Sequence, residues 1–125
     1  MIAAGIGCRS GCPGAEIAGL VRAALDEAGV GADVLAAPVR KRFEAGLREA
    51  ADLLALPLAF VEDAELAAVQ DRTQTRSARV EAAVGVASVA EAAALAAAGP
   101  GAHLLLPRRS TPRATCALAI SEVSA

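Results

Sequence analysis

Aromatic side chains are almost absent from this chain. Its 125 residues include no tryptophan and no tyrosine, and the two phenylalanines are Phe43 and Phe60. Proteins that bind single-stranded nucleic acids stack the bases on aromatic rings inside basic grooves, whereas the formal net charge here is -2. We therefore expect no nucleic-acid partner and a core built mainly from Leu, Val, Ile and Ala.

Histidine and paired cysteines are also scarce. His103 is the only histidine, and the three cysteines, at positions 8, 12 and 116, form an odd number. A zinc site needs more ligands than this, and a disulfide framework usually needs an even count. We expect no metal, no cofactor and a cytoplasmic location. Cys8 and Cys12 are interpreted either as a metal or redox pair or as small residues that fill a turn, while Cys116 should pack in the core.

Long apolar runs and N-terminal basic residues are missing too. The alanine-rich stretch 84–98 contains Ser88 and Glu91, and it is shorter than the roughly 20 apolar residues that span a membrane. The first seven residues are apolar, but no basic segment precedes them, so we expect neither a signal peptide nor a membrane partner. The length predicts a single domain over residues 1–125.

The apolar pattern predicts alternating strands and helices. The predicted strands have continuous apolar runs, which is typical of a sheet covered on both faces. Asp63 is expected to cap a short helix, and Ser88 with Glu91 forms a capping-box sequence. The fold expected is a three-layer α/β/α sandwich with a mixed, mostly parallel sheet of about five strands that ends in an antiparallel pair. Strands are expected over 2–7, 33–39, 58–61, 103–107 and 115–120, helices over 17–28, 43–54, 63–69 and 89–98, and an exposed polar loop over 71–80.

The stretch GIGCRSGCPG joins the first strand to the first helix. Gly5, Gly7 and Gly11 surround Arg9, and glycines allow a ligand to approach the backbone beside the amides of a helix start. The pattern is not G-x-G-x-x-G, because Gly11 comes one position late. An anion site and an ordinary tight turn both remain open.

Basic residues gather between the predicted elements. Lys41, the only lysine, stands between Arg40 and Arg42. Cations at a helix start oppose the helix dipole unless an anion offsets them, although a solvated charge cluster is the alternative interpretation. A second basic group, Arg108, Arg109 and Arg113, precedes the last predicted strand. These groups favour a small anionic ligand.

Catalytic candidates are few. A Ser-His-Asp triad would have to use His103, and no serine stands in a nucleophile-elbow pattern. Glu44 and Glu91 are candidates for a general acid or base by position only, and capping already accounts for Glu91.

Four segments occur together in one order: GIGCRSG at 5–11, KRFEAGL at 41–47, GVASVAEAAAL at 85–95 and LLPRRSTPRAT at 105–115. Across essentially the whole chain, this set resembles the CobE/CbiG C-terminal domain family of cobalamin biosynthesis. The second family motif resembles K-x-D-E-x-G-L, and Phe43 here replaces its first acidic residue, which weakens any role that needs two adjacent carboxylates. Matching residues in the four motifs include Gly5, Gly7, Cys8, Arg9, Gly11, Lys41, Glu44, Gly85, Ser88, Glu91, Arg108, Arg109 and Thr115.

The resemblance implies a standalone protein of the aerobic corrin pathway that binds a carboxylate-rich precorrin or hydrogenobyrinic-acid-type intermediate as an accessory or carrier. One alternative is an enzyme similar to the acetaldehyde-releasing cobalt-precorrin-5A hydrolase, with Glu44 or Glu91 as acid or base. Another is a scaffold that docks onto a second pathway enzyme. Monomer and homodimer stay open.

Amides and arginines suit the carboxylates at the rim of such a macrocycle. If the first, second and fourth strands are parallel, their carboxyl ends bring Arg9, Lys41 and Arg108 to one edge of the sheet. The ligand-binding residues expected are Gly5, Gly7, Cys8, Arg9, Gly11, Lys41, Glu44, Ser88, Glu91, Arg108, Arg109 and Thr115.

Overall fold

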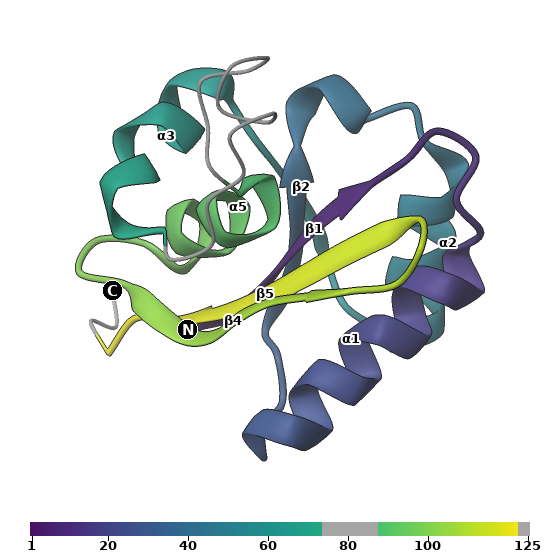
Figure 1. Ribbon diagram of the computed structural model, residues 1–125, viewed down its shortest axis with the longest axis horizontal. Helices are drawn as coiled ribbons and strands as arrows, with labels where there is room; N and C mark the ends of the chain where they lie inside the picture. Colours follow the sequence, from purple (N-terminus) through teal and green to yellow (C-terminus); the bar gives the residue numbers. More distant parts are fainter. Residues whose placement is uncertain (74–87, 123–125) are drawn as a thin grey trace.

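The computed structural model describes residues 1–73 and 88–122 (Figure 1). Gly85 and most of the loop predicted over 71–80 lie outside these residues. The strands are β1 (Ile2–Cys8), β2 (Val34–Pro38), β3 (Leu58–Val61), β4 (His103–Ser110) and β5 (Ala114–Ile120). The helices are α1 (Gly14–Ala28), α2 (Ala45–Leu54), α3 (Asp63–Ala68) and α5 (Val89–Ala98), with the short 3-10 turns η1 (Val39–Lys41) and η2 (Gln70–Arg72).

The strands form one sheet in the order β3-β2-β1-β5-β4. β1 pairs in parallel with β2, and β2 pairs in parallel with β3, whereas β5 runs antiparallel to both of its neighbours, β1 and β4. Four strands therefore point the same way, and their carboxyl ends share one edge of the sheet with the start of β5. The predicted mixed sheet and its final antiparallel pair are confirmed.

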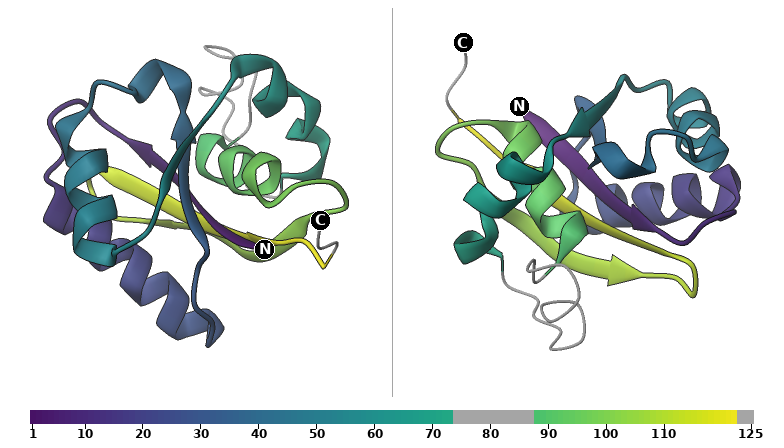
Figure 2. Two further views of the ribbon diagram at one scale, coloured as in Figure 1. Left: turned by 180° about the vertical axis from the view of Figure 1, so that it is seen from behind. Right: turned by 90° about the horizontal axis from the view of Figure 1, so that it is seen from above.

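Helices cover both faces of the sheet, as predicted. α1 and α2 pack on one face, and α3 and α5 pack on the other (Figures 1 and 2). Side chains of successive β1 residues point to opposite faces of the sheet, so they contribute to the two helix layers in turn. Ala4 and Ile6 lie in the core beneath α1 and α2, and Ala3 lies in the core beneath α5.

Helix α5 lies unusually close to the sheet. A Cβ atom added to Gly5 would lie 2.5 Å from the backbone nitrogen of Ala94 and would also meet the carbonyl oxygen of Ala90. The glycine therefore lets the helix backbone rest on β1. This close packing holds the start of α5, at Ser88, near the carboxyl end of β1.

Several local predictions need correction. β4 extends to Ser110, so Arg108 and Arg109 belong to the strand and the connection to β5 is shorter than expected. Glu62, not Asp63, is the N-cap of α3, and it forms a capping box with Glu65. Phe43 precedes α2 and is 85% exposed, so it is not part of the apolar helix face.

The guanidinium of Arg42 lies over the ring of Phe43. The distance from Cζ of Arg42 to the ring centroid is 4.7 Å. This cation–π contact gives the ring a partner outside the core. Two predicted helix ends are confirmed: α1 stops at Gly29, whose φ of 71° is left-handed, and α5 spans the predicted residues. α1 begins earlier than predicted, at Gly14, and α3 ends at Ala68, one residue before the predicted end.

Candidate functional site

Two neighbouring cavities open at the carboxyl edge of the parallel strands. The first, of about 340 Å³, lies between the end of β1, the start of α5 and the β4–β5 hairpin, and we call it the hairpin lobe. The second, of about 300 Å³, lies between β1 and η1, and we call it the η1 lobe. Gly7, Cys8 and Val89 line both lobes and form a divider between them. The two lobes together are the groove.

The hairpin lobe takes its shape from hydrogen bonds that join the end of β1 and the loop after it to the β4–β5 hairpin. The amide of Arg9 donates to the carbonyl of Arg113 over 2.9 Å, and the Thr115 hydroxyl donates to the carbonyl of Gly7 over 3.4 Å. A Cβ at Gly7 would lie 2.7 Å from the hydroxyl oxygen of Thr115. The strand pairing thus brings the first and last motifs of the sequence against each other.

A β-bulge directs Arg108 to this lobe. The register of β4 against β5 shifts between Leu106 and Arg109, next to Pro107, which has no amide hydrogen to donate. The amide of Arg108 instead donates to Oε2 of Glu91 over 2.9 Å. Glu91 is fully buried, so its carboxylate ties the bulge of β4 to helix α5.

The start of α5 adds partial positive charge to the groove. Oγ of Ser88 accepts the amide of Glu91 over 3.3 Å, which confirms the predicted serine cap. Helix geometry leaves the amides of Val89 and Ala90 without an acceptor inside the helix. Ser88 and Val89 line the hairpin lobe, so this helix end faces the space where a ligand would lie.

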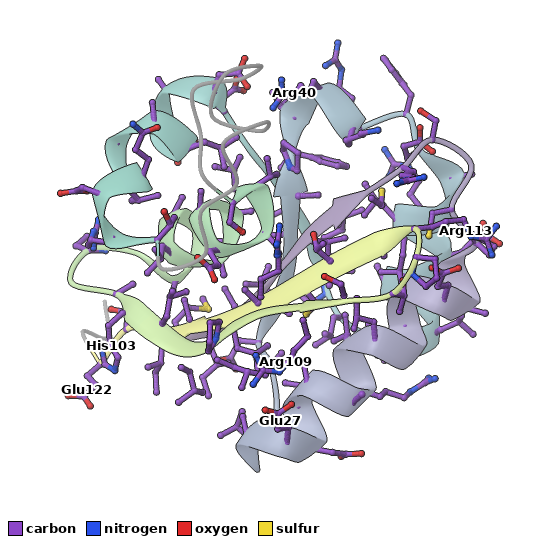
Figure 3. The ribbon with its side chains drawn as sticks, in the orientation of Figure 1. Glu27, Arg40, His103, Arg109, Arg113 and Glu122 are labelled. Atoms are coloured by element: carbon purple, nitrogen blue, oxygen red, sulfur yellow. The ribbon has the colours of Figure 1, made fainter. Side chains whose placement is uncertain are left out.

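Cations in the groove differ in how they are neutralised. Within residues 1–73 and 88–122, the ion pairs join Arg109 to Glu27 and Arg113 to Glu16. Both acids belong to α1, and Figure 3 shows Arg109 directed toward Glu27 beside that helix. The groove cations that form no ion pair with a described carboxylate are Arg9, Arg40, Lys41 and Arg108.

The two ion pairs attach the hairpin to α1. A hydrogen bond from the Thr111 hydroxyl, with further contacts from Arg113, holds the pKa of Glu16 below its ordinary value. The hydrogen bond from Arg109 likewise lowers the pKa of Glu27. Both acids are therefore charged at neutral pH and fix one wall of the hairpin lobe.

Cys8 lies in the divider as a neutral thiol. Partial burial raises its pKa, although the nearby charge of Lys41 acts in the opposite direction. Cys12 and Cys116 are buried, and burial raises the pKa of Cys116 to about 12. No group of three or more His, Cys, Asp or Glu residues that could hold a metal ion occurs within 1–73 and 88–122.

The structure brings many of the predicted site residues together. Those that line the groove are Gly7, Cys8, Arg9, Lys41, Ser88, Arg108 and Thr115. Those that lie outside its lining are Gly5, Gly11, Glu44, Glu91 and Arg109. Gly5 packs under α5, and Arg109 is paired on the α1 side.

Neither catalytic candidate lines the groove. Glu44 accepts the amide of Gly11 over 3.0 Å, so it holds the opening loop in place. The left-handed φ of 79° at Gly11 explains why a glycine stands there. The carboxylate of Glu91 accepts a hydrogen bond from the amide of Arg108. Both carboxylates therefore position groove elements.

Part of the lining was not predicted from the sequence. The charged lining residues outside the predicted ligand-binding set are Arg40 and Arg113, although both belong to the basic groups between the predicted elements. Thr111 carried no signal, because its place in the lobe depends on the length of the hairpin. A membrane segment is not among the elements described: no helix within 1–73 and 88–122 is long and apolar enough to cross a bilayer.

Comparisons with known proteins agree with this architecture. Residues 2–119 match the family described as "Cobalamin synthesis G C-terminus". The chain is 36% identical over 118 residues to a curated relative, the protein CobE of a Sinorhizobium species, covering 92% of this chain and 77% of that protein.

Solved structures are similar over almost the whole chain. A crystal structure of CobE, "a protein from the cobalamin (vitamin B12) biosynthetic pathway", is 41% identical with a TM-score of 0.89, covering 100% of this chain and 93% of that one. The cobalamin biosynthesis protein chiG from Agrobacterium tumefaciens is 42% identical with a TM-score of 0.80, covering 98% and 100%. A cobalamin biosynthesis protein G homolog from Sulfolobus solfataricus shares the fold at 20% identity and a TM-score of 0.67, covering 98% of this chain and 37% of that one.

Proposed function

Because the chain belongs to the cobalamin synthesis G C-terminus family and is a cobalamin biosynthesis protein, we propose that it is an accessory or carrier protein that binds a carboxylate-rich corrin precursor in its groove. The ligand class is a precorrin or a hydrogenobyrinic-acid-type intermediate, a largely apolar macrocycle fringed with acetate and propionate groups. The protein would hold this intermediate and deliver it to a pathway enzyme.

The observation that carries the proposal is the set of unneutralised cations around the groove. Arg9, Lys41 and Arg108 line it without an ion pair to a described carboxylate, whereas Arg109 and Arg113 are paired with acids of α1. Guanidinium groups and helix-start amides are suitable donors for carboxylates. A ligand with several acid groups would supply the missing negative charge.

The lining of the groove supports a carrier more than a hydrolase. Among the described residues, neither lobe is lined by an aspartate, a glutamate or a histidine, the usual general acids and bases. Glu44 and Glu91 hold backbone amides outside the lining. In the divider, Cys8 is the residue whose side chain could act as a nucleophile. Its raised pKa keeps it as a neutral thiol, which is a weaker nucleophile than a thiolate.

The test is a spectroscopic titration of the protein with hydrogenobyrinic acid, followed by mass analysis of the recovered ligand. A carrier gives a saturable spectral change, an unchanged ligand mass and much weaker binding after Arg9→Ala and Lys41→Ala are combined. The matched control combines Arg42→Ala with Arg48→Ala, two exposed arginines that line neither lobe, so it removes the same number of positive charges outside the groove.

Two other results would contradict the proposal in different ways. A change in ligand mass would establish an enzyme acting on the macrocycle. Absence of saturable binding by any late intermediate would leave docking to a pathway enzyme as the function to test.

A further inference from the structure

The groove has two basic lobes with an uncharged divider between them. Arg9 and Arg108 belong to the hairpin lobe, and Arg40 and Lys41 belong to the η1 lobe. The divider consists of Gly7, the thiol of Cys8 and Val89, which line both lobes. Positive charge therefore occurs at two places with an apolar surface between them.

Each lobe is suited to one acid group. The hairpin lobe combines guanidinium donors with the first turn of α5, and the η1 lobe combines a guanidinium with the Lys41 ammonium. Two carboxylates placed together in one lobe would repel each other, whereas one in each lobe would meet separate cations. The charge distribution thus favours a ligand with two acid arms, one on each side of the divider.

The size of the groove limits how much of the ligand it encloses. The lobes of about 340 and 300 Å³ each lie near the lower end of the volumes that enclose ordinary drug-sized ligands, roughly 300–1,000 Å³. A macrocycle of four linked five-membered rings with acid side chains is larger than such a ligand. The groove has room for one edge of the ring.

We propose that the protein grips one edge of a tetrapyrrole-derived macrocycle through two neighbouring acid arms, one in each lobe, with the ring edge on the Gly7–Cys8–Val89 divider. This inference rests on the proposed function and adds the part of the ligand that is recognised. The opposite edge of the ring stays outside the protein, where a receiving enzyme can bind it before release.

Deuteroporphyrin is a suitable probe because its two propionates lie on one edge of a flat tetrapyrrole ring. We would titrate the full chain with this porphyrin, with its monomethyl ester, and with a positional isomer whose propionates lie on opposite edges. Loss of one charge-assisted contact should weaken binding about tenfold, so the ester and the isomer should each bind about tenfold more weakly than deuteroporphyrin.

Variants test the assignment of one arm to each lobe. Arg108→Ala and Lys41→Ala should each weaken deuteroporphyrin binding about tenfold, while the controls Arg48→Ala and Arg42→Ala, at exposed residues that line neither lobe, leave it unchanged. Against the monomethyl ester, which has one charged arm, each lobe variant should have a smaller effect because the remaining arm can use the intact lobe. Thermal unfolding of each variant separates loss of contact from loss of fold.

Equal affinity for deuteroporphyrin, its ester and its isomer would overturn the two-arm grip, and so would failure of deuteroporphyrin to bind. Parallel titrations with hydrogenobyrinic acid separate this failure from that of the proposed function. If the corrin acid still binds, the carrier function stands and only the edge grip is wrong; if neither it nor any other late intermediate binds, both are wrong.

Discussion

The amide of Arg108 and the buried carboxylate of Glu91 form a 2.9 Å hydrogen bond that joins the edge strand β4 to helix α5. Arg108 lines the hairpin lobe, and Glu91 lies in the first turn of the helix whose start lines the same lobe. The bond therefore fixes the relative positions of the two elements that donate to a ligand there.

Removal of the Glu91 acceptor should lower both stability and ligand affinity. Glu91→Ala leaves the partly buried amide of Arg108 without its partner, which should reduce the free energy of unfolding by ~1–3 kcal/mol. Glu91→Gln keeps an oxygen acceptor and should lose less. Urea unfolding measures the difference, and equal losses for the two variants would contradict a positioning role for this hydrogen bond.

Gly5 should tolerate no side chain. In Gly5→Ala, the new methyl group would meet the backbone of α5 at Ala90 and Ala94, so the helix has to move away from β1. Overpacking of this kind costs ~1–3 kcal/mol, and the displaced helix start should also weaken ligand binding. Denaturant unfolding and a ligand titration of the same variant measure the two effects.

Gly19 provides the control for this substitution. It lies in α1, and a Cβ atom added there would have no atom of another part of the protein within 4 Å. Gly19→Ala should therefore stabilise the protein by ~0.5–1 kcal/mol, because alanine loses less chain entropy in a helix. A destabilised Gly19→Ala would show that glycine replacement itself, and not contact with α5, explains the result at Gly5.

Stability should fall in acid partly through Glu16. Its pKa is held below the ordinary value of about 4.5, chiefly by the hydrogen bond from the Thr111 hydroxyl. A carboxyl group with a lowered folded-state pKa stabilises the fold above its unfolded-state pKa, and this contribution disappears as the pH falls through the folded-state value. Thermal unfolding from pH 7 down to pH 2 should show a flatter profile for Glu16→Gln.

Substitutions at Thr111 test the cause of that pKa. Thr111→Val removes the hydroxyl and should shift the acid-induced loss of stability toward higher pH, whereas Thr111→Ser should retain the behaviour of the original protein. If the valine variant has an unchanged profile, the hydroxyl does not determine the pKa of Glu16.

Cys8 should report occupancy of the groove. Its raised pKa predicts slow alkylation by iodoacetamide at pH 7 and faster reaction as the pH rises above 9. A ligand seated on the divider should slow the reaction further, while the buried Cys12 and Cys116 contribute little. Cys8→Ser should leave only the slower background reaction of the two buried thiols, and alkylation of Cys8 at a rate independent of the ligand would place the ligand elsewhere.

Sequence patterns predicted the layered fold well because most strands are uniformly apolar and most helices have clear ends. Gly29 and Ser88 mark ends that the structure reproduces. The end of β4 was missed because the arginines after Pro107 look like loop residues, although Glu91 of α5 accepts the amide of Arg108 at the bulge and Glu27 of α1 pairs with Arg109. No local pattern reveals such long-range partners.

The same limit applies to the site. Glycine and arginine motifs identified the loops at the carboxyl edge, and Gly7, Arg9 and Lys41 do line the groove. The sequence did not distinguish Arg108 from Arg109, since successive strand residues face opposite sides and only Arg109 reaches Glu27. Nor did it show that Glu91 would support the site from inside the core.

The most direct test of the groove as the binding site is an amide chemical-shift map recorded while hydrogenobyrinic acid is added to isotopically labelled protein. We predict the largest changes at Gly7, Cys8, Val89 and Thr115, which line the groove. The internal comparison is the separate, mostly apolar cavity between α3 and α5, lined by Glu65, Leu95 and Gly99. Changes concentrated around that cavity, or no changes at saturating ligand, would contradict the assignment of the groove as the binding site.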